Sequence, residues 1–321
     1  MTKYQPVDPL ESPRFSGVRT FMRLPNLETL TDVDFIVAGI PFDTGCTYGT
    51  GSRFGPQAIR EVSGILKSFH PVLDVNVFEH CSGVDYGDIT TIPGFIEETY
   101  EKIEQGLFPV FEKKVIPVCL GGDHSVTLAE LRAAARVYGP MAIVHFDAHS
   151  DTGDSYFGKP YNHGTFFRRA IEENLIRPEN AIQVGLRGPL YDSEQFKFAE
   201  DAGVELLTNW QVRQMGMENT IARIRDRIKN GPVFVTFDID FLDAAYAPGT
   251  GTPEICGFST WEAQQLVLEG LKGADFVGFD LVEVLPSGDS PGKITAFAAA
   301  GIVFDFISLI AFNKKEGKYL R

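Results

Sequence analysis

The chain has 321 residues, and its 29 Lys and Arg against 43 Asp and Glu give a formal net charge of −14. Proteins that bind nucleic acids or anionic membranes neutralise phosphates with clustered Lys and Arg, whereas the basic groups here are isolated pairs such as Lys113-Lys114 and Lys314-Lys315. The charge therefore excludes both as expected partners. A hydrophobic fraction of 44% is ample for a large core, so we expect a folded chain rather than a disordered one.

The sequence carries no obvious targeting segment. Its first 14 residues lack the apolar stretch of a secretory signal, and the longest apolar run, residues 296–312, is interrupted by Asp305 and shorter than the roughly 20 residues that cross a bilayer. We expect a buried helix there. Four cysteines are far apart and form no Cys-x-x-Cys pair: Cys46, Cys81, Cys119 and Cys256. These features predict a cytoplasmic protein without a disulfide framework or a zinc knuckle.

Short apolar runs alternate with helical patterns along the chain. The runs have the length and continuity of strands covered on both faces, and they span residues 33–40, 115–120, 141–146, 181–186, 204–207, 233–237 and 276–281. Helices are expected at residues 56–66, 97–111, 126–137, 164–174, 218–229 and from 259 to about 271. The last begins with the capping box Ser259-Thr260-Trp261-Glu262, and Pro56 fits a first helical turn.

This alternation predicts a single-domain α/β protein, with a mainly parallel sheet between two helix layers in an α/β/α sandwich. Residues 1–30 are rich in Pro and Arg and have little periodicity, so we expect an N-terminal arm that lies on the surface or on a neighbouring subunit. Residues 31–321 would form the domain itself.

Polar side chains follow three of the predicted strands. The strand at 115–120 runs into Gly121-Gly122-Asp123-His124-Ser125, the strand at 141–146 into Asp147-Ala148-His149-Ser150-Asp151, and the strand at 233–237 into Asp238-Ile239-Asp240. In a doubly wound sheet the loops after the strands converge on the ligand site. The i, i+2 spacing in two of these segments also points both polar side chains to one side of the backbone. We therefore expect two imidazoles and four carboxylates at neighbouring strand ends.

This cluster predicts a metal centre. One Asp at a strand end is usually a helix cap or turn former, and lone histidines such as His70 and His80 are assigned no role. Four converging carboxylates, however, would repel one another strongly without cations. Carboxylate and imidazole ligands without thiolate favour Mn²⁺ over a structural zinc site, although Ni²⁺ and Co²⁺ fit the same set. Six ligands are too many for one ion that keeps room for water, so two ions sharing two carboxylates and a bridging hydroxide are expected.

The three motifs GGDHS, DAHSD and TFDIDFLD, in this order, resemble the ureohydrolase family of arginases and agmatinases. The resemblance covers nearly the whole chain and includes RFGP at 53–56, HGT at 163–165, APGTGTP at 247–253 and LVEV at 281–284. It implies an arginase-like fold, a catalytic domain over residues 31–321, and homotrimers or homohexamers.

The resemblance also implies a role for each ligand. One Mn²⁺ would be held by His124, Asp147, Asp151 and Asp238. The other would be held by Asp147, His149, Asp238 and Asp240, so that Asp147 and Asp238 bridge the two ions. No ligand position is substituted, which argues against an inactive relative.

Three residues are the expected catalytic groups: His163, Asp151 and Glu283. Glu283 matches the carboxylate that pairs with the guanidinium of the substrate, and His163 matches the histidine that shuttles protons near the leaving amine. A guanidinium is a poor electrophile, so the nucleophile must be hydroxide, which two cations supply near neutral pH. Charge-assisted hydrogen bonds from the substrate to Glu283 would set the guanidinium carbon over the hydroxide. The products would be urea and a primary amine.

The motifs predict the reaction but not the substrate tail, the part of the substrate beyond the guanidinium. Agmatine, 4-guanidinobutyrate, 3-guanidinopropionate, arginine and free guanidine share the same reactive end. The segment SYFGKPYN at 155–162 is closer to agmatinase-type members than to arginases, and agmatine, which would give putrescine, ranks first. Guanidino acids rank second, because Lys159 or Arg187 could bind a carboxylate tail. Either could equally be a surface or loop-pinning residue.

Two other classes compete with this interpretation. A deacetylase on the same fold would use a single zinc ion and fewer ligands, and the presence of His124 and Asp151 argues against it. A non-catalytic subunit of a mixed oligomer would be expected to lack a ligand, and this chain lacks none.

Overall fold

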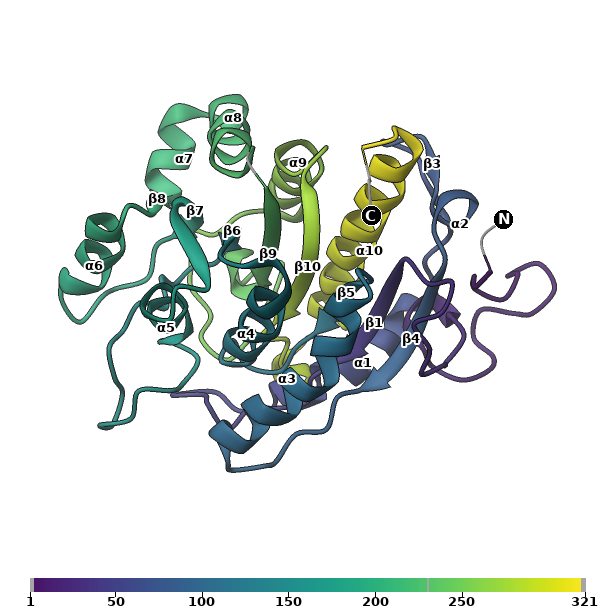
Figure 1. Cartoon of the computed structure of the whole chain (residues 1–321), viewed down its shortest axis with the longest axis horizontal. Helices are drawn as coiled ribbons and strands as arrows, with labels where there is room; N and C mark the ends of the chain where they lie inside the picture. The colour runs from purple at the N-terminus through teal and green to yellow at the C-terminus, as the bar shows by residue number, and fades with distance from the viewer. Residues whose placement is uncertain (1–2, 230, 319–321) are drawn as a thin grey trace.

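A parallel eight-stranded sheet forms the centre of the protein. The computed structural model describes residues 3–229 and 231–318. The strand order is β4-β1-β5-β10-β9-β6-β7-β8, and every pair of neighbours is parallel (Figure 1). The strands are β1 (Phe35–Gly39), β4 (Gly83–Asp88), β5 (Ile116–Leu120), β6 (Met141–Phe146), β7 (Ile176–Leu186), β8 (Glu205–Thr208), β9 (Pro232–Asp238) and β10 (Asp275–Val282). A small antiparallel hairpin, β2 (Phe69–His70) and β3 (Val75–Asn76), lies outside this sheet.

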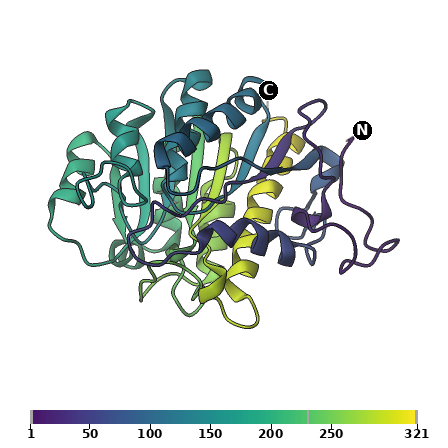
Figure 2. The same cartoon turned by 90° about the horizontal axis from the view of Figure 1, so that it is seen from below.

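Helices cover both faces of the sheet. One layer consists of α3 (Ile96–Glu112), α4 (Val126–Tyr138), α5 (Phe166–Glu172) and α6 (Glu194–Ala202). The other consists of α1 (Gly55–Ser63), α2 (Val77–His80), α7 (Asn209–Met215), α8 (Met217–Ile228), α9 (Thr260–Gly270) and α10 (Ile294–Lys315). Figure 2 shows the sheet between these layers. The strands are buried on both faces, which explains why they appear in the sequence as continuous apolar runs.

The predicted three-layer α/β/α fold is confirmed, and each predicted strand and helix corresponds to an observed element. The capping box at Ser259 is present, since its hydroxyl accepts from the Glu262 backbone N–H while the Glu262 carboxylate accepts from the Ser259 N–H. The sequence reading missed β4, the hairpin and helices α2, α6 and α7. β4 was not predicted because its sequence, GVDYGD, contains polar residues. Its buried Asp85 forms a salt bridge with Arg60 rather than packing against apolar side chains.

The apolar segment at the C-terminus is a core helix, as expected. α10 is long and apolar enough to span a membrane by composition alone, but 72% of its most apolar window is buried inside the fold. Asp305, which interrupts the apolar run, accepts hydrogen bonds from His70 Nε2 at 3.0 Å and from the Gln264 amide. Its polarity is therefore satisfied within the protein.

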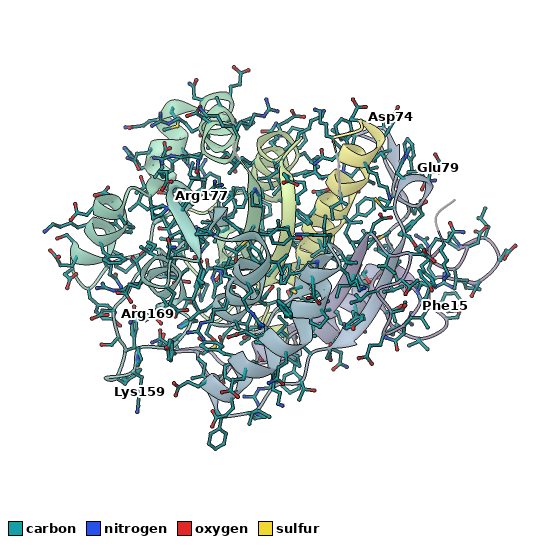
Figure 3. The ribbon with its side chains drawn as sticks, viewed as in Figure 1. Phe15, Asp74, Glu79, Lys159, Arg169 and Arg177 are labelled. Atoms are coloured by element: carbon teal, nitrogen blue, oxygen red, sulfur yellow. The ribbon has the colours of Figure 1, made fainter. Side chains whose placement is uncertain are left out.

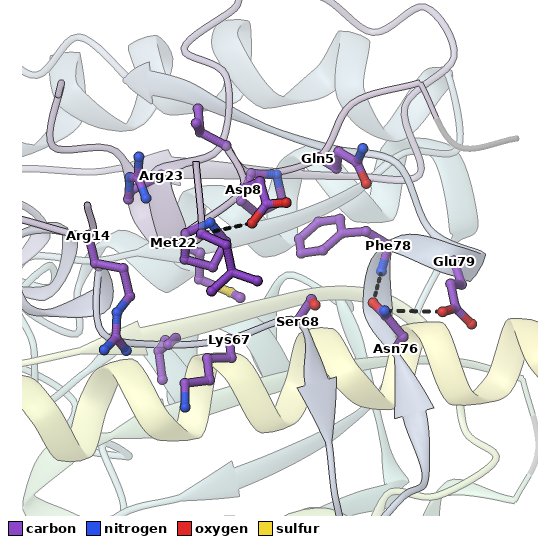
Figure 4. Close-up of a pocket in the computed structure, with 16 residues that line it drawn as sticks. Gln5, Asp8, Arg14, Met22, Arg23, Lys67, Ser68, Asn76, Phe78 and Glu79 are labelled. Carbon is purple, nitrogen blue, oxygen red and sulfur yellow. Dashed lines mark hydrogen bonds between the residues drawn. The ribbon is translucent and has the colours of Figure 1, made fainter. Parts of the chain in front are cut away.

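The N-terminal segment packs along the domain before β1. Tyr4 N–H donates to Ser82 Oγ at 2.8 Å, and Tyr4 O accepts from Gly83 N–H, at the start of β4. Further along, the segment stands away from the body and encloses a cavity of about 730 Å³, lined by residues that include Asp8, Arg14 and Lys67 (Figure 4). The outer ends of the expected arm and domain, positions 1–2 and 319–321, lie outside the described residues.

The loops after β1 and β5 approach each other closely at the edge where the strands end. Asp123 N–H donates to Phe42 O at 2.8 Å, and a Cβ on Gly122 would lie only 1.7 Å from the same oxygen. Only glycine permits this approach. The contact fixes the backbone from which His124 projects.

Replacing Asp85 with Ala is expected to destabilise the fold at its β4 edge. Asp85 accepts from Arg60 Nε at 2.9 Å and Nη2 at 3.0 Å, and from the Phe21 N–H at 2.8 Å. Because removing Asp85 leaves the buried Arg60 guanidinium with only the half-exposed Asp88 as a counter-charge, we expect a loss of about 3 kcal/mol in the free energy of unfolding, the lower end for a broken buried pair. Urea denaturation measures this loss. Asp226→Ala, which removes an exposed pair with Lys229, is the control and should leave stability unchanged. A similarly small effect of both changes would show that the buried pair does not stabilise the edge.

Candidate metal centre

The six predicted ligands converge at the carboxyl ends of three neighbouring strands. His124 follows β5, whereas Asp147, His149 and Asp151 follow β6. Asp238 is the last residue of β9, and Asp240 lies in the 3₁₀ turn η3 (Ile239–Phe241). The side chains of five of the six are nearly or fully buried, while His149 is half-buried.

These side chains form two overlapping groups. His124 Nδ1 lies 3.0 Å from Asp147 Oδ2, 3.2 Å from Asp151 Oδ2 and 3.2 Å from Asp238 Oδ2. His149 Nδ1 lies 3.1 Å from Asp240 Oδ2 and 3.5 Å from Asp147 Oδ1. Asp147 therefore directs one oxygen toward each histidine, which is the arrangement that a bridging carboxylate requires.

The site has the properties of a cation site. His124 Nδ1 is buried and makes no hydrogen bond of acceptable geometry within the described residues, although three carboxylate oxygens surround it. Its other nitrogen, Nε2, is hydrogen-bonded to Thr236 Oγ1 at 2.8 Å. A cation coordinated by Nδ1 and these oxygens would satisfy all of them, and imidazole with carboxylate is a donor set that divalent metals accept. The residues present therefore fit a metal pair.

The pKa values of the clustered side chains reflect this crowding. Burial raises the pKa of Asp238 well above its usual value, and the neighbouring Asp240 and Asp147 raise it further. Burial would raise the pKa of Asp147 too, but His145, His124 and His149 together hold it well below the usual range. Burial lowers the pKa of His124, whereas its three carboxylate neighbours raise it more. Asp238 and His124 therefore hold protons more tightly than usual, at positions where a metal cation would be favoured.

Glu283 and His163 lie beside this cluster and contact each other. Glu283 Oε1 accepts from the His124 backbone N–H at 2.9 Å and lies 3.0 Å from His163 Nδ1. In the neutral ring, the Thr47 backbone N–H donates to His163 Nε2 at 3.1 Å, so the proton is on Nδ1 and is donated to Glu283. In the charged ring, Nδ1 still donates to Glu283 and Nε2 donates to Thr47 Oγ1 at 2.7 Å. Glu283 Oε2 is buried and has no hydrogen-bond partner among residues 3–229 and 231–318. One oxygen is therefore held in place and the other is available.

The backbone is strained where two of these residues lie. Asp151 has φ of 52° and Glu283 has φ of 64°, in the left-handed region that residues with a Cβ rarely adopt. Such conformations persist only where the surrounding structure enforces them, and they cluster at functional sites. No sequence pattern could have revealed this strain.

A pocket of about 350 Å³ opens over His149, Asp151 and His163. Its outer wall includes Tyr156, which belongs to the SYFGKPYN segment that the sequence analysis used to compare substrate classes, and Tyr191 and Gln195, which sequence reasoning did not select. The Gln195 amide donates to the Tyr156 hydroxyl at 3.3 Å.

The two candidate carboxylate-binding cations do not line this pocket. Arg187 donates to backbone carbonyls in the loops after β9, including those of Ile255 at 3.1 Å and Leu242 at 3.1 Å, so it is the loop-pinning residue of the two alternatives. Lys159 is exposed, and its side chain points away from the body of the protein (Figure 3). Among the described residues that line the pocket, none is Lys or Arg.

Comparison with known proteins places the chain in a family. The family model named Arginase matches residues 33–308. The chain belongs to the arginase family. It is 42% identical over 308 residues to a guanidinopropionase of Pseudomonas aeruginosa, covering 96% of each chain, and 39% identical over 300 residues to an agmatinase of Escherichia coli, covering 92% of this chain and 94% of that protein. The proclavaminate amidinohydrolase structure of Streptomyces clavuligerus matches with a TM-score of 0.90 and 38% identity, covering 94% of this chain and 99% of that one.

The predicted membership of the agmatinase-type branch is confirmed by these relatives. The chain is a metal-dependent hydrolase that acts on guanidino C–N bonds, and its buried His and Asp cluster suits a binuclear centre. The single-zinc deacetylase alternative is not supported by this relationship.

The ionisation of His163 should make the metal-free protein less stable as the pH rises. Burial lowers the pKa of His163, but Glu283 raises it more, to about 9, above the ordinary value of 6.5. A pKa raised by folding stabilises the protein fully below about pH 6.5, and this contribution is lost as the pH rises through 9. His163→Asn keeps a donor for Glu283 but cannot be charged. With a chelator present, denaturant unfolding at several pH values measures the difference in unfolding free energy between wild type and His163→Asn. This difference should shrink from pH 6.5 to 9.5. A difference that stays constant would contradict the raised pKa of His163.

Proposed function

We propose that the chain holds two Mn²⁺ ions and hydrolyses agmatine to urea and putrescine. One ion is held by His124, Asp147, Asp151 and Asp238, and the other by Asp147, His149, Asp238 and Asp240. The donor set, without thiolate, supports Mn²⁺. The observation that carries the proposal is Glu283 Oε2, a buried carboxylate oxygen without a hydrogen-bond partner in the described chain, which lies beside the ligand cluster.

Glu283 recognises the guanidinium. Its Oε1 is occupied by two donors, so Oε2 accepts from the planar cation and orients it by a charge-assisted hydrogen bond. The site excludes most water, which strengthens that bond, since Glu283 is 1% exposed. The metal pair, when bound, lowers the pKa of water so that hydroxide is available near neutral pH.

His163 supplies the proton that the leaving amine needs. Its Nδ1–H lies against Glu283 and the ring lines the pocket, so the proton is within reach of a substrate nitrogen held by Glu283. Burial lowers the pKa of His163 but Glu283 raises it more, to about 9, so the ring is charged near neutral pH and becomes neutral when it gives up its Nδ1 proton. Asp151, held on strained backbone, completes the catalytic group as a ligand.

The pocket supports a cationic tail. Besides its lack of Lys and Arg in the described lining, Glu254 lies next to the pocket residue Gly188, where an added Cβ would approach Glu254 Oε1 to 2.8 Å. Glu254 Oε1 also lies 3.6 Å from His149 Nε2, which lowers the pKa of this carboxyl and keeps it charged. A carboxylate beside the pocket residue Gly188 attracts an ammonium tail and repels a carboxylate tail.

A guanidino acid is the second candidate substrate. The relative with 42% identity is a guanidinopropionase, and a guanidinobutyrase of the same organism is 36% identical over 310 residues. The hydroxyls of Tyr156 and Tyr191 and the amide of Gln195 could bind a carboxylate tail without a cation.

We further propose a cytoplasmic homotrimer or homohexamer with an N-terminal arm at residues 1–30 and a catalytic domain at residues 31–321.

Asp147→Ala should abolish metal binding and activity. Asp147 faces both histidine groups, so its loss removes a ligand from each half of the centre. Metal content measured by plasma mass spectrometry after reconstitution with Mn²⁺ should fall from two ions per chain to substantially less than one. Asp289→Ala is a control in an acidic loop residue outside the cluster. A variant that retains both ions would contradict the bridging role.

Glu283→Gln should keep both metal ions and lose substrate recognition. The amide retains an acceptor for the His124 N–H but carries no charge, and a hydrogen bond to a charged group contributes about 1.5–3 kcal/mol. We therefore expect kcat/KM to fall by roughly 10- to 150-fold. Steady-state urea release measures it, with metal content determined on the same sample. Unchanged kcat/KM would show that another group binds the guanidinium.

Measuring kcat/KM for a panel of guanidino compounds tests which substrate tail the enzyme prefers. We expect kcat/KM to be highest for agmatine, and Glu254→Gln to reduce it for agmatine while raising it for 4-guanidinobutyrate and 3-guanidinopropionate, because the repulsive charge is removed. Free guanidine, which has no tail, is the internal control and should respond little. Preference of the wild type for either guanidino acid would select the second candidate, and no urea from any compound would overturn the enzymatic proposal.

A further inference from the structure

A row of polar side chains crosses the otherwise apolar sheet just below the proposed metal centre. The strand register aligns five residues, one from each of five adjacent strands: Cys119, Asp280, Thr236, His145 and Gln183. All five are completely buried. His145 and Thr236 precede Asp147 and Asp238 by two residues, so they lie on the same face of the sheet as these ligands. The row therefore supports the ligands from beneath.

Hydrogen bonds determine which nitrogen of His145 carries the proton. The Gln183 side-chain amide donates to Ser150 O at 2.7 Å, and a carbonyl can only accept, so its NH₂ group must face this side. The same NH₂ group lies 2.8 Å from His145 Nδ1, which is therefore the acceptor. The proton of a neutral His145 is consequently on Nε2, which lies 2.7 Å from Asp147 Oδ2 and donates to it.

The ring of His145 has little freedom to turn. It stacks on Phe167 with ring centroids 5.3 Å apart, and it meets Phe166 edge-on at 5.5 Å and His124 edge-on at 5.0 Å. The donor is thus held in a fixed direction, toward the oxygen of Asp147 that also lies 3.0 Å from His124 Nδ1. A fixed donor there prevents rotation of the carboxylate, so the other oxygen continues to face His149.

We infer that Gln183 and His145 are positioning residues that fix the two-sided orientation of Asp147, and that His145 is not itself a metal ligand. The inference rests on the proposed metal centre. His145 lies close enough to His124, Asp147 and Asp151 to be considered a ligand by distance. However, its one lone-pair nitrogen is occupied by Gln183, and its other nitrogen bears the proton. Gln183 also ties the ligand loop to the row through Ser150, beside Asp151.

The decisive measurement is Mn²⁺ affinity, determined by titration calorimetry of the metal-stripped full chain. His145→Phe keeps the ring but removes the donor, and we expect the affinity of the centre to fall about 10- to 100-fold, as is typical when a partner of a metal ligand is lost. His145→Gln can place an amide donor near the position of Nε2, so we expect its affinity within a few-fold of wild type. If His145 were a ligand, the Gln variant would not rescue, and this result would overturn the inference.

His70→Phe is a matched control for general damage. His70 is likewise buried, accepts at Nδ1 from the Leu73 N–H at 3.2 Å, and lies with Nε2 at 3.0 Å from a carboxylate, that of Asp305, in the α10 region. Its replacement should lower the melting temperature without changing Mn²⁺ affinity. If His70→Phe and His145→Phe lost Mn²⁺ affinity equally, the loss would be explained by general destabilisation of the fold, and the positioning role of His145 would be overturned.

Gln183→Leu tests the first link of the chain. In the wild-type background it should weaken Mn²⁺ binding, because His145 then has no donor at Nδ1 and is free to place its proton there. In the His145→Phe background the same change should cost much less, and full additivity would contradict action through His145. These binding measurements need no substrate. If Asp147→Ala keeps both ions, the proposed centre fails; if it loses them while His145→Phe binds normally, only the present inference fails.

Discussion

Mutual repulsion among buried carboxylates is the constraint on which the rest of the structure depends. Asp147, Asp151, Asp238 and Asp240 meet at one edge of a parallel sheet, where burial and their neighbours raise the pKa of Asp238. Such a group is stable only if cations or protons compensate its charge, and the two histidines alone cannot do so. The proposed pair of divalent ions would add four positive charges at this point. Part of the net charge of −14 is thus concentrated in the interior rather than spread over the surface.

The sheet accommodates this charged edge through the polar layer beneath it. Buried polar groups are costly unless they are hydrogen-bonded. Thr236 bonds to His124 Nε2, and Thr127 Oγ1 donates to Asp280 Oδ2 at 2.6 Å, so the layer is connected to the ligands above and to α4 beside it. Below it the strands are apolar. One layer of polar residues therefore separates the metal centre from the core and gives the ligands fixed directions that apolar neighbours could not provide.

The sequence allowed prediction of what local pattern determines, and little of what depends on distant contacts. The buried strands were recognisable because their apolar runs are continuous, and the convergence of the six polar side chains because each follows such a run. β4 was missed because Asp85 makes it polar, and that polarity is compensated by Arg60, a partner 25 positions away. His145 had a usable signal, its i−2 spacing from Asp147, but the decisive bond comes from Gln183, on another strand and 38 positions away. Arg187 could not be assigned, because its carbonyl partners lie in loops more than fifty positions later.

In the proposed function, tail selectivity and catalysis depend on different parts of the protein. The guanidinium end would meet groups fixed by strand ends, namely the proposed ligands and Glu283, whose two donors come from the loop after β5 and from His163. The tail meets loops, in which Tyr156 packs against Gly164 and contacts Tyr191 with ring centroids 6.0 Å apart. Loops change in sequence more readily than the sheet that positions the chemistry. A family built in this way can retain one hydrolytic centre while exchanging substrates, which explains how relatives of similar identity act on tails of opposite charge.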